Sequence, residues 1–408
     1  MASKKPTFID LFAGAGGLSC GFEAAGYNCV LGMESDLWAS QTFQANHLSA
    51  VTMHSDIRTM TNEAIAGLGL QNLDLIVGGP PCQGFSHSNT ASKDPHDPRN
   101  SLFVDYLRFV KVLKPRVAII ENVPGLLGTR LQSGALVIQV ISEEFSRLGY
   151  ATHYEILDAS LYGVPQRRPR LFILAHRIDD KLKGPPFPLP SHAAGLESED
   201  ELPGFSAGLP AAVTLWDAIS DLPQIDAESP EKSNSYSCSA QNAYQKRMRD
   251  GAPTIITHHE PMRHTGRIVE RFKHIGFGQS EEDVPEDLKP RKRGNPGASS
   301  GQTYSQNSRR QRPDRPCNTV VASAHTNFIH PFLHRNFTVR ETMRIQSFPD
   351  WYSLKGKRAV LSKSLSLKKG YVDDMHLDQR MQIGNAVPPL LAEAIGRHLL
   401  SLLNFSKQ

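Results

Sequence analysis

The stretch TFIDLFAGAGG at Thr7–Gly17 decides the fold. An apolar run over 7–11 ends in glycines, which predicts a buried strand that turns directly into a helix over 17–25. Glycines at such a turn let the backbone approach a ligand closely. A dinucleotide fingerprint would place its third glycine where Ser19 stands, so the turn alone indicates only a nucleotide-like cofactor, and weakly.

The same alternation continues to about residue 177. We expect strands over 29–33, 73–77, 117–120, 154–157 and 171–175, and helices over 37–46, 102–113 and 135–148. Strands separated by helices predict a doubly wound, mostly parallel α/β sheet with helices on both faces. Ligands of such sheets bind beyond the carboxyl ends of the strands.

Composition excludes several classes of protein. The 408 residues suit two domains, and 39% hydrophobic with 21% charged residues is typical of a globular chain. No run of 18 apolar residues and no signal peptide are found, so we expect no membrane association. Five cysteines without metal-ligand spacing argue against a disulfide framework and favour a reduced cytoplasm. His258, His259, His264 and His274 fit no zinc pattern, and we expect no metal.

The second half of the chain is patterned by charge. Residues 197–231 hold nine acidic and no basic residues, and we expect this stretch to face solvent. Residues 241–315 hold 15 Lys+Arg against nine Asp+Glu, an excess of six positive charges. Such a segment is either an ordinary solvated surface or a patch that neutralises phosphates. A last helix is expected over 390–403, after Pro388 and Pro389.

Reactive side chains follow the predicted strands. Cys82 follows two prolines in GGPPCQGFS; a cysteine there is either a small buried apolar residue or a nucleophile that needs activation. Glu121 ends the next strand, where a buried carboxyl could protonate a substrate nitrogen. Arg168 and Arg170 alternate on extended backbone, so both side chains can point into the same cleft.

Together these blocks resemble the DNA (cytosine-5)-methyltransferases of bacterial restriction-modification systems. The matching blocks occur in family order from Asp10 to Pro388: DLFAGAGG, Glu34, Asp56, GGPPCQGFS, ENV, QRRPR, RPCNTV, RETMRIQSFPD and QIGNAVP. The resemblance implies a Rossmann-like fold of the class I S-adenosylmethionine-dependent methyltransferases. It also implies a catalytic and cofactor-binding domain over 1–177, a smaller irregular target-recognition domain over 178–315, and a returning segment over 316–408.

The resemblance assigns the chemistry. Cys82 would add as a thiolate to C6 of cytosine, which makes C5 nucleophilic enough to take a methyl group. Glu121 would protonate N3, and Arg168 and Arg170 would bind around O2. Because C5 and C6 are inaccessible inside a stacked duplex, the cytosine would be flipped out.

The resemblance also implies binding residues. S-adenosyl-L-methionine would be held by Phe12, Gly14, Gly16, Glu34, Asp56, Ile57, Pro80, Leu102, Asn385 and Ala386. Double-stranded DNA would be contacted by Gln83, Ser86, Ser88, Arg291, Lys292, Arg293, Arg309 and Arg310. Lys and Arg can hold phosphates, and Arg can also read base edges.

The expected biological role is protection of host DNA by a monomeric, cytoplasmic bacterial enzyme. A restriction endonuclease would share the target sequence without needing to bind. One alternative is the same chemistry on transfer RNA, for which the expected CFT-type motif is missing. A nicotinamide-dependent oxidoreductase is disfavoured by Ser19, and a catalytically dead DNA-binding protein by the intact set of Cys82, Glu121, Arg168 and Arg170.

One segment departs from the family pattern. Residues 351–380 are longer than the usual spacing and include Lys355, Lys357, Arg358, Lys363, Lys368 and Lys369. They form either a surface insertion or an extra phosphate-binding loop.

Overall fold

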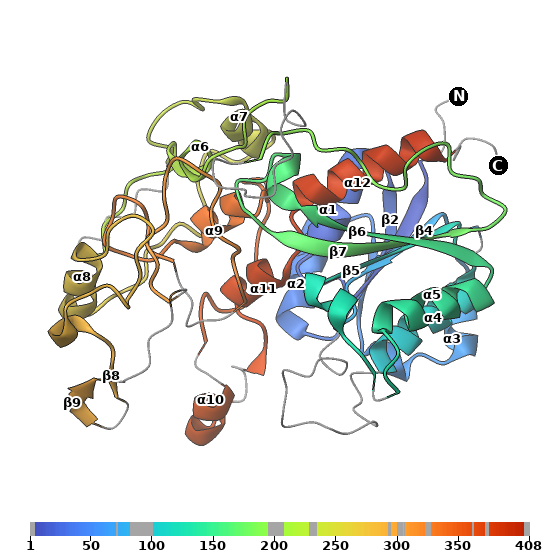
Figure 1. Cartoon of the computed structure of the whole chain (residues 1–408), viewed down its shortest axis with the longest axis horizontal. Coiled ribbons are helices and arrows are strands. Elements are labelled where there is room, and N and C mark those ends of the chain that lie inside the picture. Colours follow the sequence, from blue (N-terminus) through green and yellow to red (C-terminus); the bar gives the residue numbers. More distant parts are fainter. Residues whose placement is uncertain are drawn as a thin grey trace. The chain divides into compact units, whose positions relative to one another are not determined.

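The computed structural model describes most of the chain in two compact units (Figure 1). The described residues are 5–70, 72–81, 101–131, 133–194, 208–227, 235–292, 295–299, 305, 307–322, 328–360, 363–371 and 375–403. Unit 1 comprises Met1–Tyr162, Pro169–Pro190 and Ala386–Gln408, and unit 2 comprises Gly163–Arg168 and Ser191–Asn385.

Unit 1 is built on a seven-stranded sheet of order β3-β2-β1-β4-β5-β7-β6. Its strands are β1 (Thr7–Leu11), β2 (Asn28–Glu34), β3 (Val51–His54), β4 (Leu75–Gly78), β5 (Val117–Asn122), β6 (Tyr150–Asp158) and β7 (Pro169–Arg177). The strands from β3 to β5 are parallel, whereas β7 runs antiparallel to both β5 and β6. The prediction of a doubly wound, mostly parallel sheet is confirmed.

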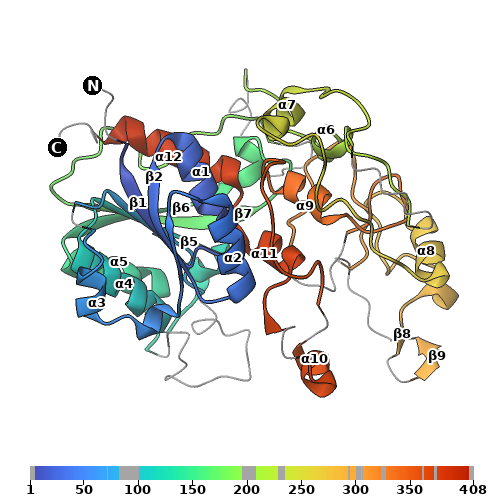
Figure 2. The ribbon, with the colours of Figure 1, turned by 180° about the vertical axis from the view of Figure 1, so that it is seen from behind.

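Helices cover both faces of this sheet (Figures 1 and 2). On one face lie α3 (Asn62–Ala66), α4 (Ser101–Leu113) and α5 (Val137–Arg147), and on the other α1 (Gly17–Ala25), α2 (Leu37–Asn46) and α12 (Pro389–Leu402). Short 3-10 turns are η1 (Ile57–Thr59), η2 (Pro124–Gly128) and η3 (Ala159–Tyr162). A continuous apolar core joins Ile9, Ile76 and Ile120 of the sheet to Phe109 of α4 and Phe145 of α5.

The last helix of the chain packs directly on the first. A Cβ at Gly21 of α1 would lie 2.3 Å from the carbonyl oxygen of Pro389 and 2.5 Å from Cβ of Ala392. A Cβ at Gly396 of α12 would lie 2.8 Å from Cβ of Ala25. Because neither glycine has a side chain, the two helices approach more closely than other residues would allow.

Unit 2 has little regular structure among its described residues. Its elements are α6 (Leu215–Ile219), α7 (Ala243–Arg249), α8 (Gly266–Lys273), η4 (Glu286–Leu288), β8 (Arg291–Lys292), β9 (Asn295–Ser299), α9 (Val339–Ile345), α10 (Lys363–Lys369) and α11 (Gln379–Asn385). Buried ion pairs hold it together. Arg344 pairs with Asp350 (Nε to Oδ1, 2.6 Å) and with Asp221 (Nη1 to Oδ1, 3.1 Å), and Arg335 pairs with Glu341 at 2.8 Å.

This network corrects one expectation. Asp221 lies in the acidic stretch that we expected to face solvent, but its side chain is fully buried. Burial is possible because Arg344 and Arg249 both lie within ion-pair distance of its carboxylate.

Among the described residues, no helix combines the length and apolarity needed to cross a lipid bilayer.

Candidate active site

The ends of four parallel strands form the predicted rim of unit 1. Strands β1, β2, β4 and β5 run in the same direction, so the segments that follow them meet at one edge of the sheet. Strand β7 runs the other way, and its register pairs Glu121 with Phe172 and Asn122 with Leu171. The start of β7 therefore lies at the same edge, beside the end of β5.

The turn after β1 leaves open space above the sheet. Phe12, Gly14 and Gly16 all have positive φ values, of 65°, 55° and 85°. A Cβ at Gly14 would meet no atom within 4 Å. Gly16 caps α1 without a side-chain hydrogen bond, so no side chain of the cap covers the first turn of the helix. An open turn at a helix start suits a cofactor that must approach the backbone closely.

Glu34 holds this turn in place. Its Oε2 accepts a hydrogen bond from the backbone N–H of Gly14 (2.8 Å), and its Oε1 accepts one from the N–H of Asp36 (2.8 Å). Burial raises the pKa of the Glu34 carboxyl, while these backbone N–H groups oppose the increase. The carboxylate that the sequence predicts to bind a ribose thus also anchors the glycine turn.

Asp56 has a partner that the sequence did not indicate. It caps η1 through the N–H of Arg58 (2.9 Å), and Nε of Arg58 lies 3.0 Å from each carboxylate oxygen. Hydrogen bonds from the Arg58 side chain lower the pKa of Asp56. A cofactor amine at Asp56 would have to share the carboxylate with this guanidinium. Ile57, the next residue, is buried.

Glu121 and Arg170 form an ion pair at the rim. Nε of Arg170 lies 3.0 Å from Oε1 of Glu121, and both side chains are about 15% exposed, at 15% and 14%. Burial lowers the pKa of the Arg170 guanidinium, and the charge of Glu121 opposes that decrease. The pair is shielded from bulk water yet reachable from the edge of the sheet.

The segment after β4 is fixed beside this pair. A Cβ at Gly79 would lie 3.1 Å from Oε2 of Glu121. Nδ2 of Asn122 donates a hydrogen bond to the carbonyl oxygen of Pro80 (3.0 Å). Pro80 is buried and Pro81 is exposed. The predicted nucleophile follows Pro81 in the sequence; Cys82, Gln83, Ser86 and Ser88 lie outside the described residues.

Arg168 differs from our expectation. It belongs to unit 2, is 2% exposed, and donates hydrogen bonds to the carbonyl oxygens of Val320 (2.7 Å) and Gly384 (2.7 Å). Arg170 belongs to unit 1 and pairs with Glu121. The expectation that both arginines point together into one cleft therefore finds no support in their contacts. Its side chain instead links two segments of backbone by hydrogen bonds.

The remaining cofactor residues have different environments. Leu102 of α4 is half-buried against the apolar core. Asn385 ends α11 with its side chain exposed, and Ala386 is buried at the start of the segment that returns to unit 1.

Asp10 lies in β1 just before the glycine turn and was not among the predicted site residues. It is fully buried, and its Oδ2 accepts a hydrogen bond from Oγ of Ser19 (2.7 Å). Burial raises the pKa of Asp10 to about 7, partly offset by that hydrogen bond. A charged residue inside an otherwise apolar strand was the available signal.

The predicted DNA-binding residues also differ in their exposure and contacts. Arg291 is exposed in β8 and Arg309 is half-buried, while the side chain of Lys292 and the whole of Arg293 lie outside the described residues. Arg310 is only 4% exposed. Its guanidinium donates to the carbonyl oxygens of Phe272, Ile275, His330, Pro331 and Leu333 and to Nδ1 of His334. These acceptors use all five N–H groups of an arginine, so the DNA contact predicted at Arg310 is wrong.

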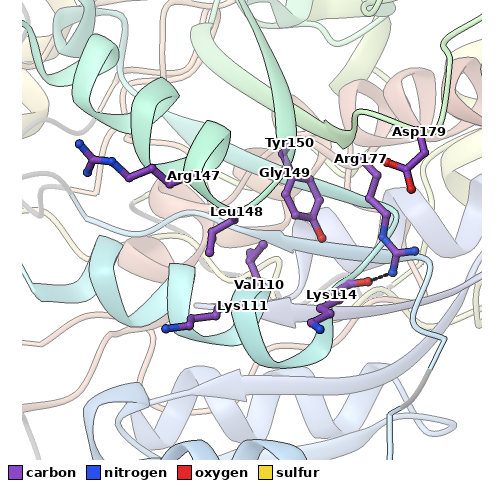
Figure 3. Close-up of a pocket in the computed structure, with 9 residues that line it drawn as sticks. All are labelled: Val110, Lys111, Lys114, Arg147, Leu148, Gly149, Tyr150, Arg177 and Asp179. Carbon is purple, nitrogen blue, oxygen red and sulfur yellow. Dashed lines mark hydrogen bonds between the residues drawn. The ribbon is translucent and has the colours of Figure 1, made fainter.

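A pocket of about 440 Å³ lies elsewhere in unit 1, at the start of β6 and the ends of α4 and α5 (Figure 3). Its lining residues are Val110, Lys111, Lys114, Arg147, Leu148, Gly149, Tyr150, Arg177 and Asp179. The ends of helices carry partial negative charge, which Lys111 and Arg147 in the last turns of α4 and α5 offset. Within the described ranges, no three metal-ligating side chains gather at any one place.

Comparison with known proteins identifies the family. The family model of C-5 cytosine-specific DNA methylases matches residues 6–401. Type II methyltransferase M.DdeI of Desulfomicrobium norvegicum is 45% identical over 96% of this chain and 88% of its own length. Type II methyltransferase M1.HphI of Haemophilus parahaemolyticus is 30% identical over 97% of this chain and 87% of its own.

A solved structure agrees with these sequence relationships. The crystal structure of a DNA modification methyltransferase encoded within an E. coli prophage superimposes with a TM-score of 0.72. The two chains are 26% identical, and the superposition covers 98% of this chain and 100% of the other. The chain therefore belongs to the C-5 cytosine-specific DNA methylase family and is a DNA (cytosine-5)-methyltransferase with the class I methyltransferase fold.

Proposed function

We propose that the chain methylates C5 of a flipped-out cytosine in a specific duplex DNA sequence through a covalent bond from Cys82 to C6. The observation that carries this proposal is the half-buried pair of Glu121 and Arg170 beside Gly79–Pro81, the segment that precedes Cys82 in the sequence. The carboxyl and the guanidinium at this edge match two of the groups that the reaction on a cytosine ring requires, and the sequence supplies a thiol in the residue that follows Pro81.

The steps balance as follows. The Sγ thiolate of Cys82 bonds to C6 while Glu121 gives a proton to N3, so the ring loses its aromaticity and C5 becomes an enamine carbon. Bound S-adenosyl-L-methionine supplies the methyl group that C5 takes. Water then takes the C5 proton, and the electrons of that C–H bond re-form the C5–C6 double bond as the C6–S bond breaks and the Cys82 thiolate leaves. N3 returns its proton to Glu121, and the product is 5-methylcytosine. Arg170 orients Glu121 and balances its charge between turnovers.

The turn after β1 fits the methyl donor. Gly14 faces open space, α1 begins without a side-chain cap, and Glu34 offers a carboxylate there that can accept a hydrogen bond from a ribose hydroxyl. By the family resemblance, the other cofactor-binding residues would be Phe12, Gly16, Asp56, Ile57, Pro80, Leu102, Asn385 and Ala386.

In unit 2, Arg291, Lys292, Arg293 and Arg309 would contact DNA. Target recognition would then reside in this unit, and the enzyme would act as a monomer that protects DNA from an endonuclease of the same specificity. This assignment rests on their positive charge and on the family, since a basic surface neutralises phosphates.

The test uses a duplex in which 5-fluorocytosine replaces the target cytosine. Fluorine at C5 cannot leave as a proton does, so the covalent intermediate accumulates after methyl transfer. With S-adenosyl-L-methionine present, we expect an adduct of protein and DNA whose mass maps to the peptide that contains Cys82. Cys82→Ser should form no adduct and transfer no methyl group, while Cys238→Ser, a change at an exposed cysteine, should behave as wild type. An adduct on any other residue would refute the nucleophile assignment.

A further inference from the structure

The segment over 355–371 of unit 2, here called the basic arm, holds six cationic residues and no acidic residue. Residues 351–371 hold six Lys+Arg and no Asp or Glu. That excess equals the excess of the whole stretch 241–315, in less than a third of its length. The next two carboxylates, Asp373 and Asp374, would still leave a net charge of +4.

The base of the basic arm is fixed by its backbone. The N–H of Gln379 donates to the carbonyl oxygen of Lys357 (2.9 Å), and Nε2 of Gln382 donates to that of Lys355 (3.1 Å). The N–H of Val360 donates to Oδ2 of Asp378 (2.9 Å). Main-chain atoms of the arm thus bond to residues at and just before α11, and Nη1 of Arg358 adds hydrogen bonds to the carbonyl oxygens of Glu260 (3.3 Å) and Pro261 (3.4 Å). None of these bonds uses Lys368 or Lys369.

The cationic side chains of the arm whose burial the structure describes are exposed. Lys355, Lys357, Arg358, Lys368 and Lys369 are all exposed. Arg358 lies 3.7 Å from Glu260, but among the residues that the structure describes Lys368 and Lys369 have no ion-pair partner. Leu367 and Tyr371 are also exposed, at 66% and 49%. A cluster of exposed cations with a net positive charge raises the local concentration of a polyanion.

The arm also projects from the body of its unit. Figures 1 and 2 show α10 and the hairpin of β8 and β9 extending from the same edge of unit 2. The hairpin carries Arg291 and Lys292, which are among the residues proposed to contact DNA. Two basic projections on one edge can lie along the same duplex, whose phosphates recur every few ångströms.

We propose that the basic arm is a second DNA contact, which grips the phosphate backbone outside the methylated sequence and reads no base. The proposal rests on the proposed function, because it takes duplex DNA as the substrate. Lysines at the tip act as point charges on a flexible stem, which suits phosphates better than base edges. The arm would therefore add affinity and salt dependence without changing the target sequence.

The matched control is the basic pocket of unit 1. Lys111 and Lys114 are exposed lysines three residues apart, and the carboxyl end of α4 offsets their charge locally. Replacing both with glutamine changes the net charge by the same amount as replacing Lys368 and Lys369. Any difference between the two variants then reports the position of the charge, not its amount.

The experiment measures DNA binding as a function of salt concentration. Bisulfite sequencing of plasmid DNA from cells that express the wild type first identifies the methylated sequence. Binding is then measured on a labelled duplex with long flanks and on one trimmed to that sequence. We expect the double variant Lys368→Gln and Lys369→Gln to flatten the slope of log K against log salt by about 2, since each phosphate contact contributes roughly 0.9. We expect the wild type to bind the duplex with long flanks more tightly than the trimmed one. The double variant should bind the two duplexes with equal affinity.

The control variant Lys111→Gln with Lys114→Gln should keep the slope and the flank preference of the wild type. An unchanged slope in the arm variant, or an equal change in the control, would overturn the proposal. A changed target sequence would show that the arm reads bases. Failure of the wild type to methylate any duplex would instead refute the proposed function, so the two failures are distinguishable.

Discussion

Asp10 of unit 1 and Glu341 of unit 2 are both buried, but their surroundings shift the pKa of the two carboxyls in opposite directions. In unit 1, Asp10 is fully buried, its Oδ2 accepts a hydrogen bond from the hydroxyl of Ser19, and burial raises its pKa to about 7. In unit 2, burial alone would raise the pKa of Glu341, but the charge of Arg335 outweighs burial and holds that pKa below its usual range. The first carboxyl tends to be neutral inside an apolar sheet, and the second is charged inside an ionic network.

The difference follows from how each unit is built. The sheet of unit 1 buries aliphatic and aromatic side chains between two layers of helices, so its stability comes mainly from apolar burial. Unit 2 has short helices and long irregular segments, and its fully buried arginines, Arg335, Arg340 and Arg344, bond to carboxylates and carbonyl groups. Arginine suits this task because its planar group satisfies several backbone acceptors at once.

The largest expected effect is on the ionic network of unit 2. Arg344→Met leaves Asp221 and Asp350 buried without their main cation, and breaking a buried pair in this way costs about 3–5 kcal/mol. Hydrogen exchange should show lost protection in α6 and α9 while the strands of unit 1 keep theirs. Urea unfolding of the wild type and the variant, measured in parallel, gives the difference in the free energy of unfolding.

A surface pair provides the control for that change. Arg147 lies 3.9 Å from Glu143 and also pairs with Glu144, and the side chains of Arg147 and Glu143 are about two-thirds exposed, at 66% and 65%. Arg147→Met should cost about 0–1 kcal/mol, because water screens an exposed pair. Equal losses in both variants would mean that the buried network contributes no more than a surface ion pair.

The next effect concerns the pH dependence of unit 1. A carboxyl whose pKa is raised by folding stabilises the folded state below its unfolded pKa, and that contribution is lost as pH rises through the folded value. For Asp10 the window runs from about 4 to about 7, and roughly three pKa units correspond to at most about 4 kcal/mol. Because asparagine has no carboxyl group, Asp10→Asn lacks this pH-dependent contribution. The difference in melting temperature between wild type and variant should therefore favour the variant increasingly from pH 5 to pH 8.

The pH dependence of stability expected for Glu341 has the opposite sign. Its pKa is lowered by folding, so its contribution is present above the unfolded pKa and is lost as pH falls through the folded value. Glu341→Gln should thus lose its disadvantage relative to wild type only in strong acid. A melting difference for Asp10→Asn that is flat from pH 5 to pH 8 would mean that Asp10 stays ionised throughout.

Much of unit 1 was predictable because its signals are local. Glycines and prolines mark the ends of β1 and β4, and the helices expected over 17–25 and 37–46 have those bounds in the structure. The direction of β7 was not predictable, since hydrophobic periodicity is the same in a parallel and an antiparallel strand. That direction decides the site, because it brings Arg170 to Glu121.

Unit 2 was predicted less well because its contacts are distant in sequence. Arg310 in a basic segment was interpreted as a DNA contact, yet its acceptors lie up to 38 residues away. Asp221 in an acidic stretch was interpreted as exposed, yet Arg344 pairs with it across 123 residues. Charge patterning alone cannot distinguish a solvated charge from one paired by tertiary structure.

The smallest expected effect tests whether unit 1 depends on close helix packing as unit 2 depends on ions. Gly21→Ala places a Cβ 2.3 Å from the carbonyl oxygen of Pro389, so α12 must move away from α1. Overpacking of this kind costs about 1–3 kcal/mol. Gly125→Ala is the control, because a Cβ there would meet no atom within 4 Å. In thermal unfolding, only Gly21→Ala should lower the melting temperature. Equal stability of the two variants would show that the contact between the first and last helices is loose, and that the returning helix is held by its apolar face alone.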